Sequence, residues 1–438
     1  MTTHKKLKQH IRARMDKTGE SYMTARRHVV GPGGDRTGLG IDPDTSALSR
    51  VLADSGVSGP IAALSEAMVL GIGGGLGAGY ILWEFSHETD RKSSHHSDED
   101  RRVVVIGFRN RWQYPDRWVD SVLERLGVSF RREQTGSSAK ARQQLDGAVE
   151  SGQSVMVDIS VADMPYWHLP IQESGWWGYT VAVVGRSENG YVVDDRSGGR
   201  LTVTSEALAI ARGRIPSYKN RIVLIEDSKH LDVDVVNAAI ASGLSGAVEH
   251  LDSGSESFSL PALKKWSRMI NADVGKGWRS VFADGRGLWS ALRSTHEAVS
   301  DSGMFGGSLR PLYAEFLDEA AELLEKPGLV EVAELYRGAA SAWDDVGDAT
   351  FPQGFEPLRE AAALARRRRE AVRLGDAGDS EAAEAASRLN ALGAEFDAGL
   401  PLMDAEIDDL FEALSAAIEE VYQTEVQAHQ ALAEVVGR

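Results

Sequence analysis

The chain has 438 residues, 42% hydrophobic and 26% charged, which suits a folded protein with two domains and a core in each. The formal net charge of −17 argues against a general nucleic-acid-binding protein, and the absence of cysteine excludes disulfides, thiolate metal sites and a thiol nucleophile. No apolar run approaches the roughly 20 residues of a membrane-spanning helix, and the N-terminus lacks the apolar stretch of a secretory signal. The simplest interpretation is a cytoplasmic bacterial protein without membrane contact.

Residues 1–30 form a basic segment, with eight Lys and Arg residues against two acidic ones. Leu7, Ile11 and Met15 recur every four residues, which predicts a narrow apolar stripe on a helix. Residues 31–39 begin with a Gly- and Pro-rich run and read as a linker. If the protein contacts nucleic acid or an acidic partner, we expect the basic segment 1–30 to make that contact.

Residues 40–227 alternate short helices with β-rich runs, which predicts an α+β domain rather than a doubly wound sheet. We expect a strand in the aromatic-flanked run before residue 86. Further strands are expected at 103–108, 154–159, 179–184, 191–194 and 221–225. Further helices are expected at 116–126, 139–151 and 205–212.

The polar run 86–100 between two expected strands reads as a solvated loop. It contains three histidines and three nearby acidic residues, namely His87, His95, His96, Asp98, Glu99 and Asp100. Their spacing matches no standard set of metal ligands, so we predict no metal site there.

Residues 228–438 lose the strand pattern and show helical periodicity, which predicts a helical bundle of about seven or eight helices. The last segment, 404–436, is long enough for a bundle helix or for a dimeric coiled coil, although strict heptads are not sustained. Four consecutive arginines, 366–369, and Arg373 form a basic helix patch, which we expect to pair with acidic helices of the same bundle.

The glycine-rich run 71–79 fits a loose dinucleotide-loop pattern. Such a loop follows a strand and opens a helix, whereas this run follows a helical segment and precedes a strand-like one. We therefore predict no cofactor. We expect instead that the backbone packs closely around a cleft at Gly73, Gly74 and Gly75, where the Cβ of any other residue would clash.

Residues 46–85, with two short helices, the glycine loop after Ser65 and Glu66, and an aromatic-flanked strand, resemble the butirosin biosynthesis protein H family. Members are acyltransferases that move an acyl group from a carrier protein to an amine, and their N-terminal domain is papain-like. The hairpin and helix at 178–225 extend the resemblance, and the Asn-Gly pair at 189–190 is itself a hairpin signal.

The run 258–345 resembles the helical domain of unknown function that usually follows this papain-like domain. The matching motifs are a KKW…KGW pair and a GG-x-LRPLYAEFLDEAA run, so the resemblance covers residues 40–350 approximately. Gly306 and Gly307 precede a helix whose first turn holds Arg310, which reads either as a surface arginine at a helix start or as an anion site.

The resemblance implies three catalytic positions, of which two differ here. The nucleophilic Cys of the family falls at about Pro43, and its His falls at Tyr179. A phenol with an ordinary pKa of about 10 is a poor base at neutral pH. The acid is retained as Asp194 or Asp195, which should point to opposite faces of a strand and not share a proton.

Other residues could replace the missing nucleophile and base, but each of them could also have a purely structural role. Thr45 and Ser46 lie at a helix start, where a hydroxyl can attack a carbonyl but more often caps the helix. His168 is the nearest candidate base in the sequence, although it also fits an aromatic wall. That apolar cleft wall would consist of Tyr166, Trp167, Trp176 and Trp177.

Three functions follow, in the order in which we rank them. The first is a degenerate acyltransferase-fold protein that binds a small molecule or a protein partner without catalysis. The second is an assembly protein that forms homo-oligomers through its C-terminal helices. The third is an active acyltransferase or amide hydrolase that uses Ser or Thr. A natural-product context follows from the resemblance alone.

Overall fold

A computed structural model describes residues 40–60, 62–85, 101–285, 287–301, 303–352, 354–397 and 399–437, together with Lys17. Residues 40–438 form one compact unit and residues 1–39 a separate one. The predictions made for the basic segment, the linker and the histidine-containing loop 86–100 therefore lie outside the described residues.

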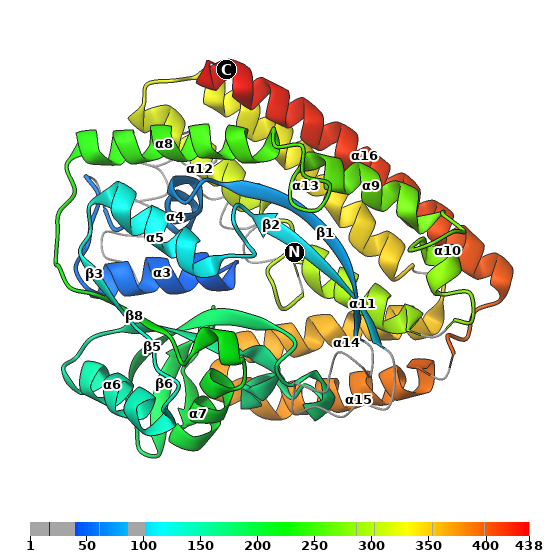
Figure 1. The fold of residues 1–438 in the computed structure, drawn as a ribbon, viewed down its shortest axis with the longest axis horizontal. Coiled ribbons are helices and arrows are strands. Elements are labelled where there is room, and N and C mark those ends of the chain that lie inside the picture. The colour runs from blue at the N-terminus through cyan, green and yellow to red at the C-terminus, as the bar shows by residue number, and fades with distance from the viewer. Residues whose placement is uncertain are drawn as a thin grey trace. The chain divides into compact units, whose positions relative to one another are not determined.

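The compact unit opens with helices that begin and end at recognisable signals (Figure 1). The first elements are α3 (Pro43–Asp54), α4 (Glu66–Ile72), β1 (Leu76–Phe85), β2 (Arg101–Arg109) and α5 (Pro115–Leu126). The side chain of Ser65 caps α4, and α5 begins at a proline and ends at Gly127 in the left-handed conformation.

A six-stranded antiparallel sheet follows, in the order β3-β8-β4-β5-β6-β7. Its strands are β3 (Phe130–Glu133), β4 (Val155–Ser160), β5 (Gly178–Ser187), β6 (Gly190–Asp194), β7 (Leu201–Thr204) and β8 (Ile222–Ile225). Two helices, α6 (Ser138–Glu150) and α7 (Ser205–Gly213), pack against it. The α+β prediction is confirmed, and β4 is buried at every position, as its unbroken apolar run indicates.

Strands β1 and β2 form a separate antiparallel ribbon, which lies among the helices rather than in the sheet (Figure 1). Gly79 and Gly107 allow the indole of Trp112 to approach the ribbon, since an added Cβ would lie 2.5 Å and 2.0 Å from its Nε1. The ribbon packs on α9 (Leu260–Ile270) and α11 (Leu288–Val299). The sequence does not predict this separation.

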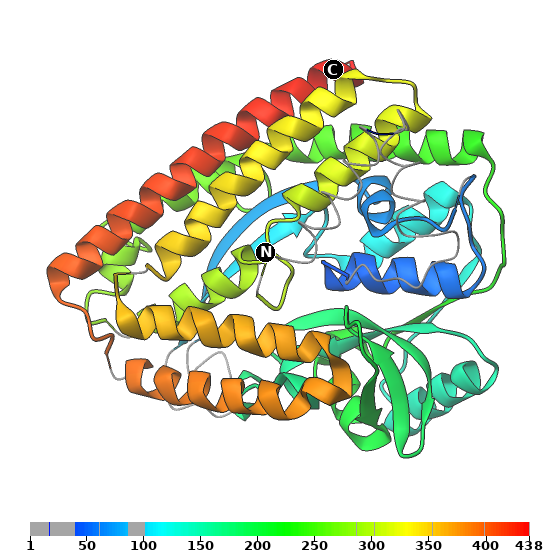
Figure 2. The same ribbon diagram turned by 180° about the vertical axis from the view of Figure 1, so that it is seen from behind.

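The remainder is helical, as predicted (Figure 2). The other helices are α8 (Val233–Leu251), α10 (Trp278–Val281), α12 (Arg310–Leu323), α13 (Gly328–Thr350), α14 (Glu356–Arg373), α15 (Asp379–Asp397) and α16 (Asp404–Val436). Helix α16 runs along α13 and α9, so its apolar side chains are buried within this chain. None of the helices in the described ranges has the length and apolar character needed to cross a bilayer.

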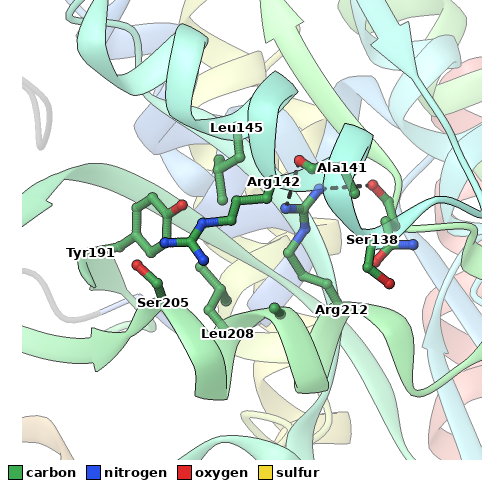
Figure 3. Close-up of a pocket in the computed structure, with 10 residues that line it drawn as sticks. Ser138, Ala141, Arg142, Leu145, Tyr191, Ser205, Leu208 and Arg212 are labelled. Atoms are coloured by element: carbon green, nitrogen blue, oxygen red, sulfur yellow. Dashed lines mark hydrogen bonds between the residues drawn. The ribbon is translucent and has the colours of Figure 1, made fainter. Parts of the chain in front are cut away.

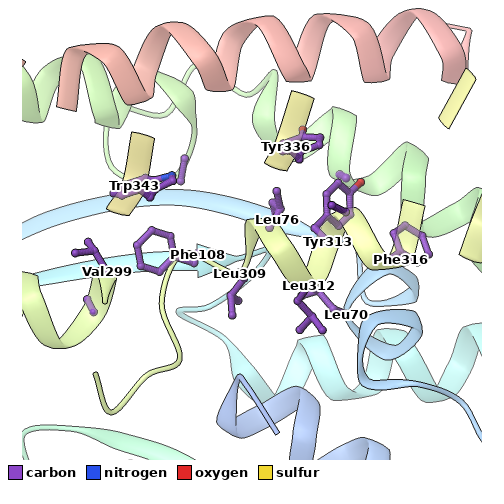
Figure 4. Packing of buried hydrophobic residues seen from close by; sticks show 14 of the residues in the cluster. Leu70, Leu76, Phe108, Val299, Leu309, Leu312, Tyr313, Phe316, Tyr336 and Trp343 are labelled. Carbon is purple, nitrogen blue, oxygen red and sulfur yellow. The ribbon is translucent and has the colours of Figure 1, made fainter. Parts of the chain in front are cut away.

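Two hydrophobic cores hold the unit together. The larger core joins Leu70, Leu76 and Phe108 to Tyr313, Phe316 and Trp343 of α12 and α13 (Figure 4). Within it, the rings of Phe108 and Trp343 meet edge to face at 4.8 Å. The smaller core lies beneath the six-stranded sheet. The domain boundary after residue 227 stays a prediction, and across it α3, α4 and the ribbon share the larger core with the later helices.

Candidate functional site

Helix α3 begins where the resemblance places the family's nucleophile. The side chain of Asp42 caps this helix and accepts a hydrogen bond from the amide of Thr45 at 2.9 Å. Pro43 follows in the first turn, where proline fits the helix geometry but offers no group that can attack a carbonyl. The helix start is therefore well formed and lacks the nucleophile at the expected position.

Asp44 fastens the start of α3 to the sheet. Its carboxylate accepts a hydrogen bond from the amide of Thr180 on β5 at 3.1 Å and one from the guanidinium of Arg109 at 2.5 Å. All three residues are buried, so this charged pair is shielded from water. The contact fixes the helix start opposite the first residues of β5.

Thr45 is the first candidate for a substitute nucleophile. Its hydroxyl donates a hydrogen bond to Glu66 at 2.8 Å, and burial raises the pKa of Glu66 to about 7, a value suited to a general base. However, Thr45 is 0% exposed, and Glu66 also accepts the amides of Ile41 and Asp42 at 3.1 and 2.9 Å. Glu66 thus closes the loop before α3, and no acyl group can reach the Thr45 hydroxyl in this arrangement.

Ser46 is the second candidate, and it is half-buried beside Gly40. A Cβ on Gly40 would lie 2.0 Å from the Ser46 hydroxyl and 2.7 Å from Cγ of Arg196, so the three residues are closely packed. Among the residues that the structure describes, no imidazole or carboxylate forms a hydrogen bond with this hydroxyl. Nothing in the described part of the chain activates it.

Tyr179 lies on β5, where the family's histidine is expected. Its hydroxyl donates a hydrogen bond to Asp195 at 2.5 Å and accepts one from the indole of Trp167 at 2.6 Å. Burial, followed by the negative charge of Asp195, raises the pKa of Tyr179 well above its ordinary value. The phenol therefore stays protonated and cannot remove a proton from a nucleophile.

Asp195 is the buried centre of this cluster. It accepts hydrogen bonds from the hydroxyl of Tyr166 at 2.9 Å and from Arg196 at 2.9 and 2.8 Å. Burial alone would raise its pKa, but the charge of Arg196 and the bond from Tyr179 hold the pKa below its ordinary value. Asp194 instead pairs with Arg50 on α3 at 3.1 Å, so the two neighbouring carboxylates have different partners.

A loop from the helical region covers the space between α3 and β5. The carbonyl of Met304 accepts a hydrogen bond from Arg196 at 2.7 Å. The ring of Phe305 lies against Tyr179 and Trp177, with centroid separations of 6.4 and 5.7 Å. An apolar side chain of the protein itself thus occupies the approach to Tyr179.

Gly306 brings the same loop against the residue before the α3 cap. A Cβ on Gly306 would lie 2.0 Å from the carbonyl oxygen of Ile41, and its φ of 86° is in the left-handed region. Gly307 follows with a φ of 77°. Only glycine allows this close contact between the helical region and the start of α3.

The aromatic residues do not form the open wall predicted from the sequence. Tyr166 and Trp167 are 4% and 0% exposed and direct their polar atoms to Asp195, so the prediction that they line a cleft is wrong. Trp177 is half-buried against Phe305. Trp176 is also half-buried, and its place in a cleft stays a prediction.

The glycine run packs against side chains rather than around a ligand. Gly74 and Gly75 have φ values of 102° and 64°, which suit glycine. Added Cβ atoms on Gly73, Gly74 and Gly75 would lie 2.1, 2.6 and 2.5 Å from Trp118, Asn110 and Tyr313 respectively. These three glycines are therefore closely packed and buried, and their place around a ligand cleft stays a prediction.

His168 belongs to a contact with the helical region. Its Nε2 lies 2.9 Å from the carboxylate of Asp379 at the start of α15, and its φ is 49°. No hydrogen bond joins it to the hydroxyl of Thr45 or Ser46 in the described residues. The arrangement gives no support to a role as their general base.

The basic patch of α14 divides into two parts. Arg367 pairs with Glu381 and Glu384 on α15, which confirms the prediction for this residue. Arg368 is 1% exposed and forms a buried ion pair with Glu297 of α11, which confirms the prediction for it as well, whereas Arg369 is equally buried and has no hydrogen-bond partner among the described residues. The apolar stripe of α14, formed by Leu358, Ala361, Ala365 and Val372, passes between these two arginines and could have revealed their burial.

A helix does begin after Gly306 and Gly307, but its first residue, Arg310, is buried, so the predictions of a surface arginine and of an anion site there are both wrong. Arg310 is 0% exposed, forms an ion pair with Glu425 of α16, and donates to the carbonyl of Gly77 at 3.0 Å. The guanidinium is thus occupied by the protein and is neither on the surface nor free to hold an anion.

Two pockets of the described structure are too small for a substrate. One is lined by residues of α6 and α7 and by Tyr191, and Arg212 there donates to the carbonyl of Ala141 at 3.2 Å (Figure 3). The other lies beside Asp158 and Arg221. Each has a cavity volume of about 10 Å³, which is at most enough for a single water molecule. No group of His, Asp and Glu in the described ranges is arranged to hold a metal ion.

The fold and the site define a class: an α+β domain with a papain-like pairing of a helix start and a strand, followed by a helical region. Residues 42–196 match the family model described as Butirosin biosynthesis protein H, N-terminal. Residues 263–371 match Domain of unknown function (DUF4872). A comparison with curated proteins found no match. Residues 42–196 therefore carry the N-terminal domain of the butirosin biosynthesis protein H family, and the helical domain of unknown function follows it at 263–371, as the resemblance predicts.

Proposed function

We propose that this protein is a non-catalytic relative of the family's acyltransferases that binds a small molecule or a protein partner. The observation that carries the proposal is the hydrogen bond from Tyr179 to Asp195. Acyl transfer through a covalent intermediate needs a nucleophile and a base that takes its proton. Here proline stands near the nucleophile's position and a protonated phenol at the base's position.

The covering loop supports the same proposal. Phe305 rests on Tyr179, and Gly306 abuts the carbonyl of Ile41 at the start of α3. An acyl group entering from this side would have to displace both contacts before it met any candidate hydroxyl. A binding protein has no such need to deliver a reactive group to that point.

An active enzyme that uses Thr45 is the second candidate, because one observation favours it. Glu66 lies 2.8 Å from the Thr45 hydroxyl and has a pKa raised to about 7 by burial. The candidate ranks lower because Thr45 has no exposed surface and Glu66 is already engaged by two backbone amides.

An assembly role through α16 ranks below both. The apolar residues of this helix, Leu410, Phe411, Leu414, Ile418, Val421 and Leu432, are buried against the chain's own helices. A dimer would therefore need another surface of α16 or other elements. The mass of the full chain in solution, measured by light scattering, tests this role directly.

The proposed function is tested by turnover with the full chain. Acyl-carrier-protein thioesters and amine acceptors are incubated with the protein, and the products are read by mass spectrometry. The matched variants are Thr45→Ala, Ser46→Ala and, as a control one turn along α3, Ser49→Ala. We expect no acylated amine above the protein-free reaction. Product that disappears in Thr45→Ala or Ser46→Ala but persists in Ser49→Ala would overturn the proposal.

A further inference from the structure

Arg369 is a buried cation for which the described residues provide no hydrogen-bond partner. Its side chain extends from α14 and is 1% exposed. Its Nε, Nη1 and Nη2 atoms all lack an acceptor within the described part of the chain. Buried arginines in proteins are normally paired with a carboxylate or bonded to carbonyl oxygens, because an isolated buried charge is strongly unfavourable.

The carboxylates nearby are engaged by other arginines. Asp195 receives two hydrogen bonds from Arg196, and Glu297 forms a buried ion pair with Arg368. The charge of Asp195 still acts on Arg369, but without a hydrogen bond. Arg369 otherwise lies against the ring of Trp167, whose centroid is 5.7 Å from its guanidinium carbon and equally far from that of Arg368. An aromatic ring that two cations share stabilises each positive charge less than a hydrogen-bonded carboxylate would.

Other positive charges surround Arg369. Burial, together with the charges of Arg196 and Arg373, lowers the pKa of Arg369 well below its ordinary value. Arginine nevertheless remains charged in proteins, so Arg369 keeps a buried charge that no described residue hydrogen-bonds. Arg373 lies one helical turn further along α14, is half-buried, and has an Nε without a partner among the described residues.

The end of α14 explains only part of this arrangement. Cations are favoured near a helix C-terminus, and Asp301 and Glu370 lie close enough to act on Arg373. The helix dipole acts over its last turn and does not supply hydrogen-bond acceptors for a guanidinium buried against Trp167. An acceptor-rich anion would satisfy the donors that remain.

We propose that Arg369 and Arg373 bind an oxyanion, the carboxylate or phosphate group of a small-molecule ligand, beside Tyr179 and Asp195. Both groups match the planar fork of donors on a guanidinium. The inference rests on the proposed binding function, since it names the chemistry of the ligand. The site lies next to the loop of Met304 and Phe305, which contacts Arg196 and Tyr179.

Thermal unfolding of the full chain tests the proposal with sodium phosphate and sodium acetate as probes, and sodium chloride at matched ionic strength as the reference. A ligand that binds the folded state raises Tm in proportion to the logarithm of its concentration above Kd. We expect phosphate, acetate or both to raise Tm more than chloride. A response to phosphate alone identifies a phosphate group, and a response to acetate identifies a carboxylate. Equal curves for all three salts would overturn the proposal.

Three variants assign the response to these arginines. In Arg369→Met the oxyanion-dependent rise should disappear, and Tm in chloride should be unchanged or higher because a buried unpaired charge has been removed. Arg373→Gln should weaken the apparent affinity for the oxyanion by at least about tenfold. If Arg369→Met does not fold, this variant alone tests whether the arginines bind the oxyanion. The control, Arg367→Gln, changes an exposed arginine on the same helix and should leave the response intact. An undiminished response in Arg369→Met or Arg373→Gln would contradict the assignment.

A crystal structure of the full chain soaked with tungstate provides an independent measurement. We expect anomalous density within hydrogen-bonding distance of Arg369. A carboxylate of the chain itself in contact with Arg369 would overturn the inference. That result would leave the proposed binding function unaffected. Acyl transfer in the turnover assay would instead contradict the proposed function without contradicting the oxyanion site.

Discussion

The hydroxyl of Tyr179 donates a hydrogen bond to the carboxylate of Asp195 across 2.5 Å. In the resembled enzymes a histidine would face an acid at this place, and the acid would orient the histidine for proton transfer. A phenol in the same position keeps the contact with the acid but cannot accept a proton at neutral pH. The pair therefore supports the fold and not the chemistry.

The first prediction concerns the contribution of this hydrogen bond to stability. Tyr179→Phe removes the donor to Asp195 and the acceptor for Trp167, so we expect a loss of about 1–3 kcal/mol in the free energy of unfolding. Urea unfolding of the full chain measures it. Tyr114→Phe, at a tyrosine that is 48% exposed, serves as the control and should change the value by less than about 0.5 kcal/mol. Equal effects would contradict the assigned role.

The second prediction concerns the buried ion pair of Asp195 and Arg196. Asp195→Asn leaves Arg196 uncompensated, so we expect a loss of about 3–5 kcal/mol, part of which returns in the double variant with Arg196→Met. Asp379→Asn, which alters an exposed carboxylate paired with His168, should cost less than about 1 kcal/mol. A double variant no more stable than Asp195→Asn alone would show that the two residues do not act as a pair.

The third prediction is a pH dependence at Glu66. Burial raises the pKa of Glu66 from 4.5 to about 7 in the folded protein, so ionising it lowers stability as pH rises through this window. Glu66→Gln removes that loss. The variant should match the wild type near about pH 5 and exceed it by roughly 1–3 kcal/mol near about pH 8. Glu188→Gln, at an exposed turn, should show no such divergence. A constant difference between Glu66→Gln and the wild type would rule out the raised pKa.

The fourth prediction concerns the covering loop. Gly306→Ala places a Cβ against the carbonyl of Ile41 at a left-handed φ, so we expect a loss of roughly 1–3 kcal/mol, measured by urea unfolding. Gly338→Ala, on an exposed face of α13 with no atom near the added Cβ, should instead gain about 0.4–1 kcal/mol. A neutral Gly306→Ala would mean that the loop does not depend on this contact.

Much of the fold follows from local signals in the sequence. The apolar run that predicts a strand at 154–159 corresponds to β4, and the Asn-Gly pair joins β5 to β6 as a hairpin. The long final helix is found at Asp404–Val436. These elements are set by periodicity and turn residues, which act over a few neighbouring positions.

The parts that the sequence does not reveal depend on contacts between distant residues. The β1–β2 ribbon is separate because it packs on α9 and α11 instead of the sheet. Arg310 is buried because its partner, Glu425, lies on α16. Thr45 resembles an accessible helix cap in the sequence, but Glu66 encloses it. Pairings of this kind leave no pattern in a single sequence.

The mass of the intact chain after exposure to a simple acyl thioester tests the central claim most directly. The account predicts an unchanged mass, because no described hydroxyl near the start of α3 is both accessible and activated by a base. A mass increase equal to one acyl group would contradict the account if peptide mapping places that group on Thr45 or Ser46 and it is lost in the matching alanine variant.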